Sequence, residues 1–456
     1  MLQMLIQSWA KTENTINSTE EIIDWVKKTN DSLVVNIDAN KLSDSSFWFH
    51  DEEKGIITNN NNSFFLIQGI QVKKNDEILM EQPIILQNEI GYLGVICKEI
   101  KGTLYFLMQA KIEPGNINKV QISPTIQATK SNFTRKHGGD IPAYLEYFMN
   151  VNEHMVIVDQ IQSEQSSRFY KKRNRNIIIK VNTDIEILPS HRWMTLGQMK
   201  QLMKYDNLVN MDTRTVLSCL PYSLMDKGSE ALSIYFKDSA LYRSIFERNN
   251  MVELTVVYNY INNYKMFDDT RERLVPLSEL GKWDIIDEGI HCKEKYSFSV
   301  KYFDIEVEGR EVRKWTQPLF KAEGIATFGL LTSIRDGVRK FLVHAEPEIG
   351  CFDKIELGST IQREAVCMKK EDIIQKLFLQ QYERRKGILY DVILSEEGGR
   401  FYHEQNRNII MDVCNEKIPD LPEGYFWVSY STLNILTQVN NCVNIQLRNL
   451  LSLLEV

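Results

Sequence analysis

QPIILQNEIGYLGVICKEIKGTLYFLMQAKIEPGNINKVQISPTIQ, residues 82–127, occurs a second time as QPLFKAEGIATFGLLTSIRDGVRKFLVHAEPEIGCFDKIELGSTIQ, residues 317–362. The two segments align without a gap at an offset of 235 residues, and 14 of their 46 positions are identical. Average amino-acid usage would give roughly three identities by chance. The two segments therefore descend from one ancestral segment.

The duplication extends over most of the chain. Residues 163–178 match residues 395–410, and residues 193–218 match residues 427–452. A period above two hundred residues indicates duplicated domains, because solenoid and propeller repeats have periods of about 20–50 residues. Positions kept in both copies serve the fold or a shared ligand. Ionisable positions present in only one copy are candidates for chemistry.

The repeat divides the chain of 456 residues into four parts. We predict an N-terminal helical arm at residues 1–40, a first repeat at 41–220, a helical linker at 221–273 and a second repeat at 274–456. Ser18 and Glu21 form a capping-box pattern that predicts a helix in the arm. In the linker, residues 229–248 and 251–267 have helical apolar spacing.

Each repeat combines strand and helix patterns. Alternating apolar residues predict strands at 64–72, 103–112, 297–307 and 338–347. A helix is predicted at 141–150, and Thr195 and Ser429 stand where N-caps of later helices would lie. The predicted fold class is α/β (α+β), with two tandem mixed-sheet domains.

Composition narrows the classes of function. The net charge of −7 argues against a general nucleic-acid binder, and the sequence lacks an apolar run long enough to span a membrane. Seven scattered cysteines are typical of free thiols in a reducing cytoplasm, and neither they nor the histidines have the spacing of a metal site. No G-x-G-x-x-G motif follows a strand, so we expect no nicotinamide cofactor.

Two polar segments are candidates for ligand binding. Residues 109–139 are rich in hydrogen-bonding side chains, which suits a polyol or a solvent-exposed β-meander. In residues 168–176, RFYKKRNRN, the second copy keeps Arg, Phe, Tyr and both asparagines but not the neighbouring charges, so Arg175 and Arg407 are structural or shared by both pockets. Trp48 and Trp283 could stack on a base or sugar, or pack in the core.

Three longer motifs carry a family resemblance: FLMQAKIEPGNINKVQISPTIQATKSN, QSEQSSRFYKKRNRN and LVNMDTRTVLSCLP. They resemble the NDP-hexose 2,3-dehydratase family of deoxysugar biosynthesis over residues 48–456. The resemblance implies two Nudix-like domains that arose by duplication, a homodimer and no redox cofactor. It also implies a 4-keto-6-deoxyhexose substrate on a nucleoside diphosphate, most often dTDP.

The implied reaction is a β-elimination. The C4 ketone acidifies the C3 proton, a base removes this proton, and the enolate expels the C2 hydroxyl as water. The enol product then tautomerises to a 3,4-diketone. A base near C3, an acid near the C2 oxygen and donors for the O4 enolate are needed.

Roles follow from comparing the two copies. Glu113 or His137 is the predicted proton-transfer group. Because Glu348 repeats Glu113 in the second copy, a structural ion pair is an alternative for Glu113. Lys111, which Glu346 replaces in the second copy, is the predicted donor to O4. The predicted substrate contacts are Trp48, Gln109, Ser123, Thr125, Gln127, Lys130, Asn132, Arg135, Tyr170, Arg173 and Arg175, with the two last arginines on the diphosphate. A second pocket would contain Trp283, Thr360, Gln362, Tyr402 and Arg407.

Two alternative functions remain at this point. A non-catalytic nucleotide-sugar binder would have no reason to keep ionisable residues in one copy only. A Nudix-type hydrolase would release a nucleoside monophosphate, but neither copy has the clustered glutamates of the hydrolytic signature.

Overall fold

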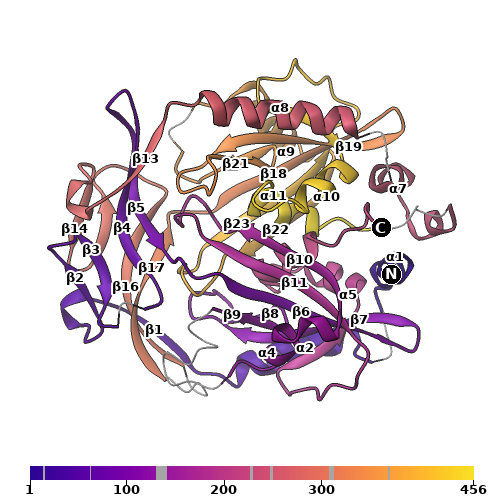
Figure 1. Ribbon diagram of the computed structural model, residues 1–456, viewed down its shortest axis with the longest axis horizontal. Helices are drawn as coiled ribbons and strands as arrows, with labels where there is room; N and C mark the ends of the chain where they lie inside the picture. Colours follow the sequence, from indigo (N-terminus) through magenta and orange to yellow (C-terminus); the bar gives the residue numbers. More distant parts are fainter. Residues whose placement is uncertain are drawn as a thin grey trace.

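The computed structural model describes residues 1–13, 16–61, 63–129, 141–225, 230–246, 250–307, 313–367 and 370–456. Within these residues the strands form two seven-stranded and two five-stranded sheets, with helices between and around them (Figure 1). This architecture confirms the predicted α+β class with mixed sheets. In this part of the chain, no helix is long and apolar enough to cross a membrane.

The first seven-stranded sheet is built by the first copy. Its order is β10 (Met155–Ser163), β11 (Arg173–Val181), β6 (Gly91–Ile100), β7 (Thr103–Ile112) and β12 (His191–Met194), with β8 (Val120–Ser123) on β7 and β9 (Ile126–Ala128) on β6. β6 and β11 are parallel, whereas β7 is antiparallel to its neighbours. β7 has the predicted bounds.

The second seven-stranded sheet repeats this topology. Its order is β22 (Ile388–Ser395), β23 (Gln405–Asp412), β18 (Ala326–Arg335), β19 (Val338–Pro347) and β20 (Ile355–Gly358), with β21 (Ile361–Arg363) on β18 and β24 (Tyr425–Ser429) on β19. β18 and β23 are the parallel pair. The matching topology agrees with the duplication.

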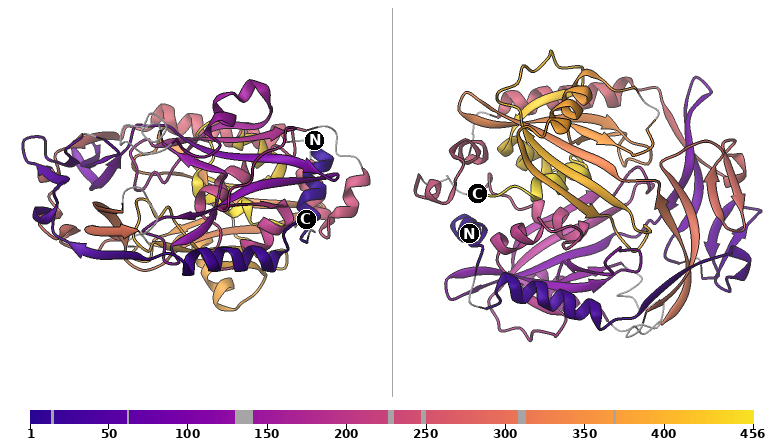
Figure 2. Two further views of the ribbon diagram at one scale, coloured as in Figure 1. Left: turned by 90° about the horizontal axis from the view of Figure 1, so that it is seen from below. Right: turned by 180° about the vertical axis from the view of Figure 1, so that it is seen from behind.

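The two five-stranded sheets lie at the end of the molecule away from both termini (Figures 1 and 2). One contains β2 (Trp48–Asp51), β3 (Ile56–Asn59), β4 (Leu66–Lys74) and β5 (Glu77–Leu86); the other contains β14 (Trp283–Ile286), β15 (Gly289–Cys292), β16 (Phe298–Val307) and β17 (Lys314–Ala322). Each takes its fifth strand from the other half: β13 (Arg271–Val275) pairs with β4, and β1 (Val35–Asn40) pairs with β16. The two halves thus exchange one strand each. The domain boundaries predicted at residues 40 and 273 remain predictions.

Helices from both copies pack in the centre: α5 (Leu196–Leu202), α6 (Met211–Ser218), α10 (Tyr430–Thr437) and α11 (Ile445–Ser452). Thr195 and Ser429 are N-caps as predicted, since their side chains accept hydrogen bonds from the first turns of α5 and α10. α6 packs against α11. The buried Arg214 of α6 donates to the Ser395 carbonyl at 2.8 Å, and Arg448 of α11 donates to the equivalent Ser163 carbonyl.

The remaining helices lie at the edges. They are α1 (Leu2–Ala10), α2 (Thr19–Asp31), α4 (Leu145–Met149), α7 (Ser239–Phe246), α8 (Met251–Phe267) and α9 (Ile373–Glu383), with 3-10 turns at Leu42–Asp44, Val151–Glu153, Glu230–Tyr235 and Leu277–Glu279. The Ser18 capping box and α8 confirm two predictions. The helix predicted at 141–150 is shorter because Tyr144, at φ 62°, has a left-handed conformation that a helix cannot contain. The predicted 229–248 helix is likewise not continuous.

Candidate active site

Glu113 directly follows β7 and lies almost fully buried where the two copies meet. Lys111, two residues earlier and so on the same side of the strand, places Nζ 3.0 Å from Oε1 of Glu113. Gln127 Nε2 donates to the same oxygen at 2.8 Å, and the backbone N–H of Gly398 donates to Oε2 at 3.1 Å. A cation and two donors all favour the ionised carboxylate, which is the form required of a base.

The Gln127 amide is itself held in place. Its Oε1 accepts from Ser123 Oγ at 3.1 Å and from Asn210 Nδ2 at 3.3 Å. Asn210 is the N-cap of α6 and accepts from the backbone N–H of Thr213 at 2.8 Å. The start of α6 therefore fixes the orientation of the amide that binds Glu113.

The segment 396–400 of the second copy closes this cluster. The backbone N–H of Gly115 donates to the Gly398 carbonyl at 2.7 Å, and that of His403 donates to the Gly115 carbonyl at 2.8 Å. A Cβ atom on Gly115 would lie 1.8 Å from the Phe401 carbonyl oxygen, so only glycine fits there. The candidate site is thus composed of residues from both copies.

Two further carboxyl groups belong to the cluster electrostatically. Burial raises the pKa of Asp212, on α6, well above its usual range; Glu164, Glu397 and Glu113 add to this effect, and Lys111 opposes it. Burial also raises the pKa of Glu397, against the influence of Arg400. A carboxyl group with a raised pKa near a carboxylate that a cation contacts is the usual arrangement of an acid and a base.

The second copy builds the same frame with different charges. Gln362 Nε2 donates to Glu348 Oε1 at 2.8 Å, and Asn444 Nδ2 donates to Gln362 Oε1 at 2.6 Å. The positions of Lys111, Ser123 and Asp212 are instead Glu346, Gly358 and Gln446. Burial, with Glu346 and Glu356 nearby, raises the pKa of Glu348 to about 8. This carboxyl group is therefore mainly neutral at pH 7.

The profile of the NDP-hexose 2,3-dehydratase family matches residues 19–220 and again residues 254–454. The chain belongs to the NDP-hexose 2,3-dehydratase family. Three relatives carry the name dTDP-4-dehydro-6-deoxy-alpha-D-glucopyranose 2,3-dehydratase. The Saccharopolyspora spinosa protein is 35% identical over 91% of this chain and 90% of its own length. The Amycolatopsis orientalis protein is 35% identical over 98% and 92%, and the Streptomyces violaceoruber protein is 34% identical over 90% and 91%.

The two segments that match the NDP-hexose 2,3-dehydratase family begin 235 residues apart, in α2 and in the equivalent helix α8. The unit that the family duplicates therefore includes helices that the sequence places in the arm and in the linker. Ile22 and Val26 of α2 are buried, and so are Val257 and Ile261 of α8 at the same offset. α2 and α8 therefore each bury the same two positions of the repeat.

Four of the predicted ligand contacts have a structural role in both copies. The Thr125 hydroxyl accepts from Ile96 N at 2.9 Å and donates to the Leu107 carbonyl, and the hydroxyl of Thr360 repeats both contacts. Trp48 and Trp283 are 3% and 4% exposed in one aromatic core between the five-stranded sheets. Their side chains thus lie in the core, as one of the two alternatives expected.

The arginines of the RFY segments also pair within the protein. Arg175 contacts both carboxylate oxygens of Asp159 at 2.6 Å, and Arg407 contacts the equivalent Asp391 at 2.8 Å. Arg173 lies with its guanidinium 3.8 Å from the centre of the Phe352 ring. The contacts of Arg175 and Arg407 join neighbouring strands, and the contact of Arg173 joins the two copies.

The other predicted residues are placed as follows. Gln109 lies on β7 between Ser123 and His191. Tyr170 packs against an apolar cluster that includes Ile349, and Tyr402 stacks on Phe303 at 4.2 Å. Lys130, Asn132, Arg135 and His137 lie outside the described residues.

Sequence reasoning missed Asp212 and Glu397. Asp212 stands in VNMDTRTVLS, where the second copy has VNIQLRNLLS. It is therefore an ionisable residue present in one copy only, which is the criterion that selected Lys111. Glu397 belongs to the other copy, and its approach to Glu113 depends on how the halves dock.

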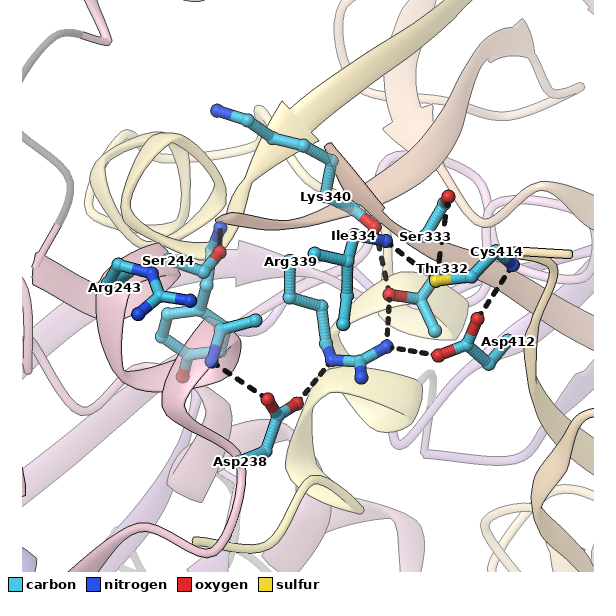
Figure 3. Close-up of polar contacts among 12 residues, drawn as sticks. Asp238, Arg243, Ser244, Thr332, Ser333, Ile334, Arg339, Lys340, Asp412 and Cys414 are labelled. Carbon is cyan, nitrogen blue, oxygen red and sulfur yellow. Dashed lines mark hydrogen bonds and ion pairs between the residues drawn. The ribbon is translucent and has the colours of Figure 1, made fainter. Parts of the chain in front are cut away.

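A cavity of about 520 Å³ lies elsewhere, beside α7 and the second seven-stranded sheet. Its Arg339 is bound by Asp238 through Nε and by Asp412 through Nη1, the latter at 2.7 Å (Figure 3). The equivalent residue in the first copy is Leu104. These ion pairs attach the segment before α7 to the sheet, so we assign them a structural role.

Proposed function

We propose that this chain is a 2,3-dehydratase that eliminates the C2 hydroxyl, as water, from a 4-keto-6-deoxyhexose carried on dTDP, the substrate in the relatives' names. The observation that carries the proposal is the buried carboxylate of Glu113, which Lys111, Gln127 and Gly398 hold, in a frame that the second copy repeats without the lysine. This asymmetry is expected if only one copy performs chemistry.

Each step has a candidate group. Glu113 accepts the C3 proton, and the electron pair of that C–H bond forms the C3–C4 enolate. Lys111 donates to O4 and stabilises the negative charge there. Collapse of the enolate restores the C4 carbonyl, forms the C2–C3 double bond and expels the C2 oxygen, which takes a proton from Asp212 or Glu397 and leaves as water. The 3-hydroxy enol then tautomerises to the 3,4-diketone.

Binding of the sugar is assigned to the groups around Glu113. Gln109, Ser123 and Gln127 come from β7, β8 and β9: Gln109 pairs with Ser123, and Ser123 holds the Gln127 amide that contacts this carboxylate. His137 remains an alternative base, and Asn132 remains a candidate for the sugar. Lys130, Arg135 and Arg173 remain candidates for the diphosphate. A cytoplasmic location, a Nudix-like fold and a homodimer are part of the same proposal.

The second cluster supports an accessory binding role. It keeps the Gln362, Glu348 and Asn444 contacts but has Glu346 where the first copy has Lys111. Titration calorimetry with a non-reactive dTDP-sugar should therefore give two sites per chain, and Gln362→Ala should remove one without lowering kcat.

The decisive experiment follows the reaction itself. The protein is incubated with dTDP-4-keto-6-deoxyglucose deuterated at C3, and the product is trapped with an aromatic 1,2-diamine, which condenses with vicinal diketones. Loss of one water and of the deuterium is expected in wild type and in the matched Glu348→Gln control, but not in Glu113→Gln. Recovery of unchanged substrate from wild type would support the non-catalytic binder, and release of dTMP would support the hydrolase.

A further inference from the structure

Three aromatic rings of the second copy stack in a column beside the candidate site. The Tyr402 ring is close to parallel with that of Phe303, at 4.2 Å between ring centres, and with that of His403, at 4.1 Å. Since one face of a ring holds one stacked ring, Tyr402 lies between the other two. Phe303 is 4% exposed and closes one end of the column, whereas His403 is exposed and leaves the other end open.

The column lies at the site of the first copy. The backbone N–H of His403 donates to the carbonyl of Gly115, two residues after Glu113, at 2.8 Å. Ile112, directly before Glu113, packs against the apolar cluster that contains Phe303. Two residues of chain span at most about 7 Å, so the open end of the column stands next to Glu113.

The RFY segment of the first copy makes the same backbone contacts with different side chains. The N–H of Lys171 donates to the Gly350 carbonyl at 2.7 Å, as that of His403 does to Gly115. Lys171 and His403 both have a left-handed backbone, with φ of 55° and 51°. At the second site the residue beside Tyr170 is therefore a lysine, whose Nζ lies 5.0 Å from the centre of the Tyr170 ring.

The inner end of the column differs between the copies as well. Gln82 and Gln317 are equivalent positions of the repeat. Gln317 pairs with Phe303 of β16, and Gln82 pairs with Ile70 of β4. Ile70 thus stands where the first site has an aromatic ring, and among the described residues the apolar cluster around Tyr170 contains no other ring. Only the first site has an aromatic column.

We propose that the exposed face of His403 stacks on the thymine base of the substrate, so that Phe303, Tyr402 and His403 form the base platform of the first site. This inference rests on the proposed function, because it places the base of the nucleotide whose hexose lies at Glu113. The diphosphate and the deoxyribose separate base and hexose, so the base belongs beside this carboxylate. The proposal also assigns Tyr402 to the first site and Tyr170 to the second, the reverse of their order in the chain.

A stacked histidine suits a planar pyrimidine. Bases stack on aromatic side chains, and a ring that is already held by its neighbour loses less conformational freedom when a ligand binds. Burial, with Lys321 nearby, lowers the pKa of His403 below its ordinary value of 6.5. The imidazole is therefore mainly neutral at pH 7, and a base can cover it without removing water from an imidazolium ion.

The test separates binding of the base from binding of the diphosphate. His403→Ala should raise KM for dTDP-4-keto-6-deoxyglucose about 10-fold with kcat unchanged, because stacking holds the ground state and the transition state alike. The inhibition constant of dTDP should rise by the same factor, whereas that of inorganic pyrophosphate should stay at the wild-type value. His403→Phe restores a ring and should return KM toward wild type. Lys171→Ala, the matched control, should leave KM unchanged.

Four results would overturn the proposal: an unchanged KM in His403→Ala, an equal weakening of dTDP and pyrophosphate, no recovery in His403→Phe, or a fall in kcat at constant KM, which would indicate proton transfer by His403. Because His403 is exposed, circular dichroism of His403→Ala should match that of wild type. If wild type does not dehydrate the sugar, the proposed function fails, whereas calorimetry with dTDP on the same variants still tests the platform.

Discussion

The two carboxylate clusters of this chain have the same frame and opposite electrostatics. In the first, Glu113 has a lysine at 3.0 Å; in the second, Glu348 has Glu346 at the equivalent position, and its pKa rises to about 8. The amide of Gln127 or Gln362 contacts the carboxylate at 2.8 Å in both. Duplication thus preserved the hydrogen bonds of the frame, while the charge two residues before the carboxylate changed from a lysine to a glutamate that adds to the effect of burial on the pKa of Glu348.

The largest expected effect comes from neutralising the two glutamates separately. Glu113→Gln keeps the size of the side chain but cannot accept a proton, so kcat should fall about 10³-fold. Glu348→Gln should change kcat by less than about threefold, because that carboxyl group is already mainly neutral. Equal losses in steady-state assays of the two variants would mean that both copies catalyse.

Exchanging the neighbouring charge sharpens the comparison. Lys111→Glu gives the first copy the charge pattern of the second, so Glu113 should become protonated and O4 should lose its donor, with a fall in kcat of about 10²-fold. Glu346→Lys is the matched control and should lower the pKa of Glu348 without a change in kcat. For both variants the measurements are kcat and an infrared or NMR titration of the carboxyl group, Glu113 in the first and Glu348 in the second. A fully active Lys111→Glu would remove Lys111 from the mechanism.

Asp212 tests whether the acid is also confined to the first copy. Asp212→Gln copies the residue of the second copy, Gln446, and should lower kcat about 30-fold. Burial raises the pKa of Asp212 well above its usual range, so the wild-type rate should decline as rising pH ionises this group, and Asp212→Asn should lose that alkaline limb. An unchanged pH profile in Asp212→Asn would transfer the role to Glu397.

The same comparison separates what the sequence predicts from what it does not. β7 and β19 were predictable because their apolar residues alternate over ten positions, and Lys111 and Ser123 were selected because the second copy lacks them. The exchange of β1 and β13 was not predictable, since a short strand does not encode its partner. Tyr144 ends a helix through its backbone conformation, which no apolar spacing reports.

Contacts between the copies were the least predictable part of the site. The Gly398 N–H that binds Glu113 lies 285 residues away in the chain, and only docking of the halves brings it there. Arg175 and Arg407 illustrate the opposite difficulty. Their motif is kept in both copies and so resembles a ligand site in the sequence, but in the structure each arginine pairs with an aspartate on the neighbouring strand.

The smallest expected effect is on stability and concerns Glu348 alone. Its folded-state pKa of about 8 lies above the ordinary value of 4.5, so between these pH values the folded protein binds the proton that the unfolded chain has lost. The free energy of unfolding should therefore decrease as pH rises from 4.5 to 8. Glu348→Gln removes this dependence and should raise the free energy of unfolding more at pH 8 than at pH 5. Urea denaturation of both proteins at the two pH values measures the difference. A parallel pH dependence in wild type and variant would mean that Glu348 is ionised in the folded protein, and the electrostatic contrast between the two clusters would then be lost.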